Sequence, residues 1–405
     1  MSQRIGSRWL ATLGVALALS ACHDAPTAAP AATASASAVK FWDVGSSVAW
    51  NTTARELLPG SVHATPTGQP RAFAYLSVAQ YNAVVAAEEA NGNGARASVA
   101  AAAAGASWEV LKSLFPASVA LLNERLATQK AAERWAGARQ EDWAAGEAIG
   151  RSVGLAVVAY AATDADDKLP APANPGGVGN WTGTNPVLGF YGWRTFALTS
   201  DDQFRPGPPP EFGSQAFLDA FEEVRAMNAE ITAGLAPDHL QIARDWAGRG
   251  GAYMNGIATA MIVDHHRTEI EAARILALAN MAAFDVLDAC FDAKLAYYYI
   301  RPVQYAATLV PPLDPAFALH VPMPNHPSYP SGHSCVTGAY ATVLKDAFPD
   351  QAAYLQGRIE EAGLARMYGG LHYRFDCEAG RELGRNVAEW VMKTAPHGHA
   401  AIPLD

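Results

Sequence analysis

The stretch His326-Pro-Ser-Tyr-Pro330-Ser331-Gly332-His333-Ser334 stands directly before the apolar run 335–344. Proline and serine ahead of such a run are typical of a helix start, so we expect a helix over about 332–347. The Ser331 hydroxyl, the Gly332 N–H and the helix dipole together favour a bound anion, and Gly332 allows close approach because it has no Cβ. His333 would lie on the first turn, where an imidazole can pass a proton to or from an oxyanion. A capped helix with an incidental histidine is the alternative.

A second motif follows, Arg366-Met-Tyr-Gly369-Gly370-Leu-His372-Tyr-Arg-Phe-Asp376. We expect the glycine pair to end one helix, over about 350–366, and to let the next begin, over about 373–394. His372 and Asp376 would lie at positions i and i+4 of that next helix. The carboxylate can then accept one imidazole N–H and leave the other nitrogen as a ligand or nucleophile. Arg366 adds a guanidinium whose fork geometry suits an oxyanion.

A third motif precedes both, Lys294-Leu-Ala-Tyr-Tyr-Tyr-Ile-Arg301-Pro302. In a helix over about 268–300, positions i and i+7 share one face, so the two cations can converge on one anion. Pro302 disfavours helix at Arg301, which would place the arginine at a helix end, free to reach into a pocket. Two cations at this spacing are often only a solvated face. The segment is otherwise apolar, however, and a cation in such surroundings requires a partner.

Taken together and in order, Lys-x6-Arg-Pro, Pro-Ser-Gly-His and Arg-x5-His-x3-Asp resemble the signature shared by vanadium-dependent haloperoxidases and type 2 phosphatidic acid phosphatases (PAP2). The resemblance is strongest over 238–390, and residues 240–247 are also similar to the haloperoxidase branch. It implies that His372 is the axial vanadium ligand of a peroxidase or the phosphorylated nucleophile of a phosphatase, with Asp376 beside it and His333 as the acid–base residue. One cradle suits both reactions because vanadate mimics the transition state of phosphoryl transfer. The oxygens of vanadate or phosphate would be held by Lys294, Arg301, Ser331, Gly332 and Arg366.

Three features favour the haloperoxidase branch. Ala365 stands where phosphatases of this class commonly have serine, the chain is much longer than a minimal PAP2 domain, and it lacks the membrane spans of lipid phosphatases. We therefore expect a vanadate-dependent enzyme that oxidises halide with hydrogen peroxide. The alternative is an acid phosphatase that hydrolyses phosphate monoesters through a phosphohistidine and needs no cofactor. A lipid-anchored protein that only captures oxyanions is a further alternative, although capture does not need His333 or the pair His372 and Asp376.

The preference for a halide has one clue in the sequence. His326 stands five residues before Ser331, where by the same resemblance chloride-oxidising enzymes carry phenylalanine and bromide-oxidising algal enzymes carry histidine. This favours bromide or iodide over chloride. Phe291, one helical turn before Lys294, would be an apolar wall of the halide site. Simple packing of both side chains is the alternative reading.

The rest of the sequence predicts an all-α fold, with helical bundles, two by our interpretation, in one globular unit. Ala, Leu, Glu and Arg dominate, large apolar residues recur at helical spacing, and alternating strand patterns are nearly absent. We divide the chain into an N-terminal helical region, 40–236, and a domain carrying the oxyanion site, 237–395. Residues 168–212 are rich in Pro, Gly and aromatic residues, and a loop of that length is usually functional or a cover. The other expected helices are 71–90, 97–114, 117–134, 136–162, 214–230 and 237–248.

The N-terminus resembles an export signal. Arg4 and Arg8 precede an apolar stretch that is too short to span a bilayer, and the stretch ends at Leu19-Ser-Ala-Cys22. This resembles a bacterial lipoprotein signal over 1–21, which would make Cys22 the lipidated first residue of an exported, membrane-anchored protein. An ordinary secretory signal is the alternative. Residues 22–39 read as a flexible tether rich in Ala, Pro and Ser.

Composition excludes several classes of protein. The formal net charge is −10, so we expect no nucleic-acid partner. Four cysteines exclude a disulfide scaffold, and we interpret Cys335 and Cys377 as small buried hydrophobic residues. We read Asp264-His265-His266 as a polar turn between helices and 397–399 as a tail, not as metal sites. The expected partners are small molecules, with membrane contact only through Cys22, and the sequence leaves a homodimer open.

Overall fold

The computed structural model describes residues 44–65, 68–135, 142–164, 170–308, 313–395 and 401. Within these ranges the chain forms α-helices and two short 3-10 helices, with no strand, which confirms the all-α prediction. The α-helices are α2 (Ser46–Leu57), α3 (Gln69–Gly92), α4 (Val99–Leu114), α5 (Val119–Trp135), α6 (Trp143–Ala162), α7 (Gln215–Thr232), α8 (Pro237–Ala247), α9 (Gly251–Asp264), α10 (Glu269–Tyr297), α11 (Pro302–Ala306), α12 (Gly332–Ala347), α13 (Ala352–Tyr368) and α14 (Arg374–Thr394). The 3-10 helices are η1 (Pro116–Ser118) and η2 (Pro349–Gln351).

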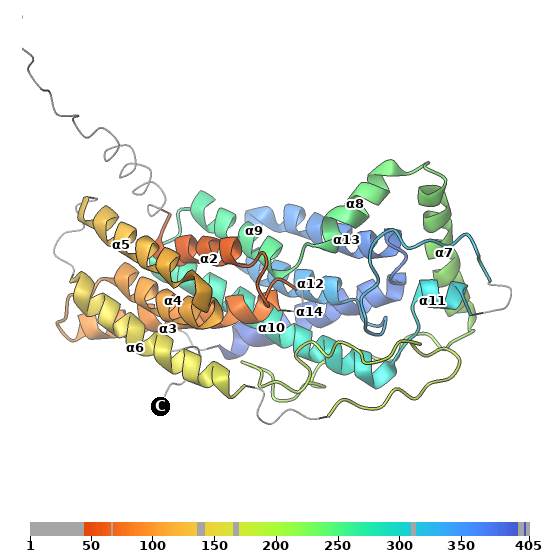
Figure 1. Cartoon of the computed structure of the whole chain (residues 1–405), viewed down its shortest axis with the longest axis horizontal. Helices are drawn as coiled ribbons and strands as arrows, with labels where there is room; N and C mark the ends of the chain where they lie inside the picture. The colour runs from red at the N-terminus through yellow and green to blue at the C-terminus, as the bar shows by residue number, and fades with distance from the viewer. Residues whose placement is uncertain are drawn as a thin grey trace, which may run out of the picture.

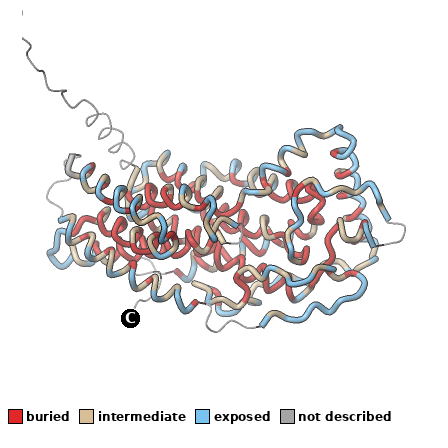
Figure 2. The backbone as a smooth tube through the Cα atoms, viewed as in Figure 1, coloured by how far each residue is buried: buried red, intermediate tan, exposed pale blue. Residues whose placement is uncertain are grey.

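Helix α10 is the centre of the fold, and α3, α12 and α14 pack against it (Figure 1). A capping box between Thr268 and Glu271 starts the helix. Side chains along most of its length are buried, and Figure 2 shows this as the red interior of the molecule. A helix that is apolar nearly all round is stable only inside a core. The motif that begins with Lys294 therefore lies where the core helix ends.

The end of α10 differs from the prediction. Tyr298 takes a left-handed backbone conformation with φ of 46°, and its carbonyl accepts a hydrogen bond of 2.6 Å from the N–H of Trp181. Tyr299 pairs with Asn180 in an isolated antiparallel bridge. Because these contacts draw the chain out of the helix after Tyr297, the expectation that Lys294 and Arg301 share one helix face is wrong. Arg301 lies instead in extended backbone at the N-cap of α11.

Three α-helices were not predicted: α2, α9 and the five-residue α11. Helix α2 carries serine, threonine and asparagine at buried positions, and the Asn51 side chain donates to the side chain of Gln80 at 2.8 Å. Helix α9 begins with glycine and shows no clear apolar stripe. Helices α2 and α9 are held by neighbouring helices rather than by a strong local pattern, which is why periodicity alone misses them.

The segment 170–214 connects α6 to α7 without regular structure and runs along α10, at the lower edge of Figure 1. We call it the covering loop. Asp285 on α10 accepts hydrogen bonds from three consecutive backbone N–H groups of the loop, 196–198, at 2.8, 2.8 and 3.2 Å. Arg205 donates twice to the Asp292 carboxylate, at 2.6 and 2.7 Å. The loop is therefore a fixed cover on the core helix.

Several predictions outside the three motifs have a structural outcome. His265 and His266 follow the end of α9 in a turn, as expected, and the His265 ring pairs with Asp350 at 3.0 Å. Cys335 and Cys377 are buried and unbridged. No helix in the described ranges has the length and apolarity to cross a membrane.

Other predictions stay open. Cys22, the signal 1–21, the tether 22–39 and the histidines of 397–399 lie outside the described residues. The largest core cluster draws on both predicted regions, 40–236 and 237–395, and the boundary between them stays a prediction.

Candidate active site

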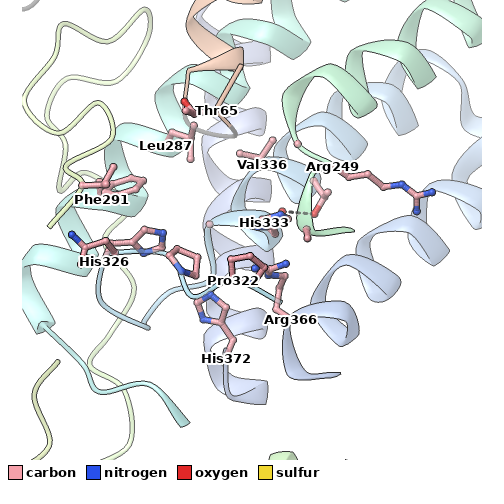
Figure 3. Close-up of a pocket in the computed structure, with 17 residues that line it drawn as sticks. Thr65, Arg249, Leu287, Phe291, Pro322, His326, His333, Val336, Arg366 and His372 are labelled. Carbon is pink, nitrogen blue, oxygen red and sulfur yellow. Dashed lines mark hydrogen bonds between the residues drawn. The ribbon is translucent and has the colours of Figure 1, made fainter. Parts of the chain in front are cut away.

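Two of the three motifs line one cavity of about 330 Å³, and the motif 294–302 is not among its lining residues (Figure 3). In Figure 3, Phe291 and His326 lie on one side of the cavity and His333 on the other. The candidate residues on its wall are Phe291, His326, Gly332, His333, Arg366 and His372. The remaining candidates are buried and do not line it: Lys294, Arg301, Ser331 and Asp376. The predicted residues therefore fall into two groups: those that line the cavity, and those that are buried and do not line it.

His372 lies on the wall and is oriented by a carboxylate behind it. Its Nδ1 is 2.9 Å from Oδ2 of Asp376. The same oxygen accepts hydrogen bonds from the Tyr373 N–H at 3.1 Å and from the Ser328 hydroxyl at 2.5 Å. Because Nδ1 donates to the carboxylate, Nε2 carries the lone pair, and Nη1 of Arg301 donates to it at 3.3 Å. A ligand or nucleophile at Nε2 requires this tautomer and would take the place of the Arg301 hydrogen bond.

The route to this geometry differs from the prediction. Helix α14 begins at Arg374 with Tyr373 as N-cap, so His372 precedes the helix and does not share a helical face with Asp376. Asp376 lies in the first turn, where a carboxylate accepts free N–H groups and is favoured by the helix dipole. The glycine pair does end α13 as expected, and Gly370 has φ of +74°.

Arg366 is the candidate with unused hydrogen-bonding capacity. It is 2% exposed near the end of α13, and its Nε and Nη1 have no hydrogen-bond partner within the described part of the chain. The Ser331 hydroxyl is likewise buried and unpartnered. A Cβ built at Gly332 meets open space, so the first N–H groups of α12 can be approached closely. Buried donors without partners are costly, and a tetrahedral oxyanion would satisfy them.

Lys294 and Arg301 have partners already. The Lys294 ammonium donates to the carbonyls of Pro327, at 2.9 Å, and Ser328, at 2.8 Å, and also to that of Pro330. Arg301 donates to the His326 carbonyl at 3.0 Å and to the carbonyl of Leu371 at 2.9 Å. Both cations therefore hold the segment 326–330 in place. Their direct contact with an oxyanion stays a prediction.

The site carries an excess of positive charge. Burial lowers the pKa of Lys294 to about 8, that of Arg301 to about 9 and that of Arg366 to about 10, so all three stay charged at neutral pH. Burial raises the pKa of Asp376 to about 6, which leaves this carboxylate ionised at the same pH. Burial, reinforced by Arg301, lowers the pKa of His372 well below its usual value and keeps the ring neutral. Three cations and one carboxylate leave a net charge of about +2 at the site, which an oxyanion with two negative charges would neutralise.

His333 lies in the first turn of α12, as predicted. Its Nε2 is 3.0 Å from the Trp246 carbonyl at the end of α8, so this nitrogen carries a proton. The pKa of His333 is lowered well below its usual value, chiefly by burial and then by Arg366. Burial is therefore the main reason why the ring of His333 is neutral at pH 7.

His326 and Phe291 are in contact, with ring centroids 5.2 Å apart in an edge-to-face arrangement. A guanidinium nitrogen of Arg301 lies 3.0 Å from His326 Nδ1. The Pro327 carbonyl lies 3.1 Å from the same nitrogen. Because arginine can only donate, we assign Nδ1 as the acceptor of the Arg301 hydrogen bond, which leaves the proton of the neutral ring on Nε2. Burial, reinforced by Lys294, lowers the pKa of His326 well below its usual value. A neutral N–H donor on an otherwise apolar wall can bind an anion as weakly hydrated as a halide.

Sequence reasoning missed several contributors. Ser328, between two prolines of a quoted motif, holds Asp376, and its place in the motif was a usable signal. Leu287 lines the cavity one turn before Phe291, so helical spacing would have indicated it. Val187 reaches the cavity from the covering loop and Trp246 contributes a carbonyl, and no local pattern indicates either.

Comparison with known proteins agrees with the motifs. Residues 271–397 match the model of the PAP2 superfamily. A vanadium-dependent bromoperoxidase of Ascophyllum nodosum is 33% identical over 93 residues, which is 16% of this chain and 17% of that protein. A non-specific acid phosphatase of Salmonella typhi is 42% identical over 57 residues, which is 14% of this chain and 23% of that protein. The chain thus matches less than a quarter of the length of either relative.

Solved structures resemble much more of the chain. A bacterial vanadium-dependent iodoperoxidase has a TM-score of 0.71 at 24% identity, and the match covers 89% of this chain and 97% of that one. A bacterial vanadium-dependent chloroperoxidase in its apo form has a TM-score of 0.64 at 11% identity, over 82% of this chain and 94% of that one. At these identities the likeness establishes a common fold.

Proposed function

Because residues 271–397 form a PAP2 superfamily domain, we propose that the chain is a vanadate-dependent haloperoxidase that oxidises bromide or iodide with hydrogen peroxide. One observation carries the oxyanion chemistry: the buried, unpartnered donors of Arg366 share a cavity with His372, whose Nε2 is left as a lone pair by Asp376. Two features favour the peroxidase branch. Ala365 replaces the serine common in phosphatases, and haloperoxidases share the fold over most of the chain.

The donors present fit vanadate. His372 would ligate it through Nε2, and Arg366, the Ser331 hydroxyl and the Gly332 N–H would bind its oxygens. Lys294 and Arg301 lie behind and add positive charge. Bound vanadate supplies Lewis-acid activation of peroxide. His333, neutral near pH 7, can accept a proton at the cavity and return it, which is the role of an acid–base residue.

The halide would bind in the cavity beside His326 and Phe291, which both line its wall. The neutral N–H of His326 donates one hydrogen bond, and the Phe291 ring excludes water from the other side. Larger, weakly hydrated halides pay less for this partial dehydration, which favours bromide and iodide over chloride. Replacing His326 by phenylalanine removes the donor and should change the ratio of halide rates more than the affinity for vanadate.

The test is a pair of activities on one preparation. The purified protein, loaded with vanadate, is assayed for oxidation of iodide, bromide and chloride by hydrogen peroxide. The same protein without vanadate is assayed for hydrolysis of 4-nitrophenyl phosphate. Halide oxidation that depends on vanadate and is lost in His372→Ala supports the proposal. Phosphate release with no halide oxidation would reject it in favour of the second candidate.

That second candidate is an acid phosphatase. It is favoured by the 42% identity to an acid phosphatase over 57 residues and by the same His372 geometry. In this reaction Nε2 attacks the phosphoryl group, and His333 protonates the leaving alcohol and then activates water. Trapping of a phosphorylated His372 after acid-free quenching would establish it. Vanadate would then be a competitive inhibitor.

We also propose export and lipid anchoring through Cys22. The support is the order of basic, apolar and small residues before this cysteine. The natural protein should partition with membranes, and Cys22→Ala should release it. A soluble natural protein whose first residue is alanine or serine would contradict this.

A further inference from the structure

His333, the proposed acid–base residue, is held by the junction between α8 and α9, residues 246–250. Its Nε2 donates to the Trp246 carbonyl at 3.0 Å, and the backbone of Arg249 accepts a further hydrogen bond from the ring. A carbonyl oxygen can only accept, so two of them beside one ring favour its protonated form, which has two N–H groups where the neutral form has one. The junction therefore orients the ring and stabilises a proton that the ring takes up.

The junction is itself anchored through the side chain of Trp246. This side chain is fully buried, and its indole Nε1 donates to Oε1 of Glu361 on α13 at 2.8 Å. It also packs against Ala362 and Ala365 of the same helix. One tryptophan thus has two tasks, because its carbonyl holds His333 while its ring is held by Glu361.

Glu361 is fixed in turn by two arginines. Arg358, one turn earlier on α13, lies 2.8 Å from Oε2 of Glu361, and the Arg249 guanidinium, which points away from the cavity in Figure 3, lies 3.8 Å from Oε1. The Glu361 side chain is 25% exposed, so water can solvate the carboxylate and its charge does not require the indole. The bond instead satisfies the buried indole N–H and fixes the end of α8 against α13.

Helix α13 also carries Arg366, the proposed donor to the oxyanion, five residues after Glu361. A single helix therefore determines both where the oxyanion is bound and, through Trp246, where the ring of His333 lies. Such a fixed geometry matters for rate, because a displacement of about 1 Å at a reacting group can cost roughly 10²-fold.

We propose that Glu361 is a positioning residue for His333 and that it acts through Trp246. Glu361 does not line the cavity, so it touches neither the oxyanion nor the reacting atoms. Its hydrogen bond with the indole holds the Trp246 carbonyl against Nε2 of His333, which keeps the proton of the neutral ring on Nε2 and leaves Nδ1 to accept another. This role rests on the proposed function, in which His333 exchanges the proton.

The first test compares turnover and vanadate affinity, with turnover measured in whichever of the two assays is active. Glu361→Ala removes the acceptor and should lower turnover by roughly 10–100-fold, with vanadate affinity unchanged because Arg366 and His372 remain. Glu361→Gln keeps an acceptor oxygen for the indole and should retain turnover within about threefold of the wild type. Glu360→Ala is the matched control, because Glu360 is an exposed carboxylate next to Glu361 on the same helix.

A second variant tests the route through the tryptophan. Trp246→Phe removes the indole N–H, keeps the carbonyl that holds His333, and should be as slow as Glu361→Ala. The double variant should be no slower than either single variant, because both changes break the same bond. Should Trp246→Phe fail to fold, the partly exposed Glu361 carries the test through its Ala and Gln variants.

Three results of these rate measurements would overturn the proposal. One is wild-type turnover in Glu361→Ala. Another is a loss of vanadate affinity in proportion to the loss of rate, which would show general damage to the site. The last is a Glu361→Gln variant as slow as Glu361→Ala, which would show that the charge matters and the hydrogen bond does not.

The second test does not depend on turnover. Heteronuclear NMR of the full chain with isotope-labelled histidine distinguishes protonated from unprotonated ring nitrogens, and the spectrum of His333→Ala assigns the signals. The wild type and Glu361→Gln should carry the His333 proton on Nε2, and Glu361→Ala should show a mixture of both tautomers. An unchanged tautomer in Glu361→Ala would overturn the proposal. A mixture there, with no turnover in either assay, would support the positioning role and reject only the proposed function.

Discussion

The covering loop and the active-site cavity both bury charged groups, but they satisfy them differently. Beneath the loop, Asp285 receives three backbone N–H groups and Asp292 receives a bidentate arginine. At the cavity, Arg366 keeps two buried donors without a partner. A buried charge that has its partners stabilises a fold, whereas a buried charge that lacks them is evidence for a ligand.

Asp288 shows why the sign of the charge matters in this comparison. Its carboxyl group is buried beneath the same loop next to that of Asp201, with which it shares a hydrogen bond when it carries a proton. Burial, reinforced by Asp201, raises its pKa to about 10, so this side chain is a neutral acid at pH 7. A buried carboxylate loses its charge when it takes up a proton, whereas a buried guanidinium stays charged because arginine does not lose its proton so readily. Arg366 therefore needs an anion where Asp288 does not.

The largest expected effect comes from removing His372. His372→Ala takes away Nε2, and turnover in the active assay should fall by about 10⁴-fold or more. His265→Ala is the matched control, because His265 also pairs with a carboxylate but lies in the turn after α9. Steady-state rates of both proteins test this, and wild-type turnover in His372→Ala would remove this residue from the site.

His333→Ala should separate binding from catalysis. Oxyanion affinity should largely persist, because Arg366, Lys294 and Arg301 remain. Turnover should fall by roughly 10²–10⁴-fold, the usual contribution of a general acid–base residue. A vanadate titration beside a rate assay measures both quantities. Loss of affinity in proportion to the loss of rate would show instead that His333 is a binding residue.

Two arginine variants compare the regions directly. Arg366→Ala should weaken vanadate and phosphate by about 2–5 kcal/mol, while its unfolding free energy should not fall by more than about 1 kcal/mol because no hydrogen bond is lost. Arg205→Ala breaks a partly exposed pair with Asp292 and should lower the unfolding free energy by about 1–2 kcal/mol with vanadate affinity unchanged. Urea unfolding and vanadate titration give the unfolding free energy and the vanadate affinity of each variant. If the two variants behaved alike, the distinction between the regions would fail.

Counted over a single pH unit, the smallest effect is the pH dependence of the free energy of unfolding contributed by Asp288. Its pKa is raised from 3.8 to about 10 in the folded protein, so between these values the folded state binds one more proton than the unfolded state. Stability must then decrease as pH rises, by at most about 1.4 kcal/mol per pH unit. Asp288→Asn mimics the neutral acid and should remove this slope. Urea unfolding should show a gain over wild type at both pH 6 and pH 9, larger at pH 9 because the wild type loses stability between them, and an equal gain at both would refute the neutral acid.

The sequence alone was enough for most of the helical fold and for the site residues. Helical spacing is a local property, so α3, α7, α8, α12 and α13 lie close to their predicted ranges. The ordered motifs likewise singled out Arg366, His372 and Asp376, which the structure brings together at one cavity, and their roles stay predictions. The start of α12 at Gly332 followed from proline and serine ahead of an apolar run.

Only the tertiary structure decided which of these residues face the cavity and which lie behind it. Lys294 and Arg301 were expected on one helix face, but contacts of Tyr298 and Tyr299 with the covering loop end α10 between them. Val187, from a segment without periodicity, became part of the wall, and α2 formed on contacts with other helices. These outcomes depend on which distant groups satisfy a backbone or fill a space. Contacts between residues that are far apart in sequence depend on the free energy of the whole chain. They therefore leave no signal in a local sequence pattern.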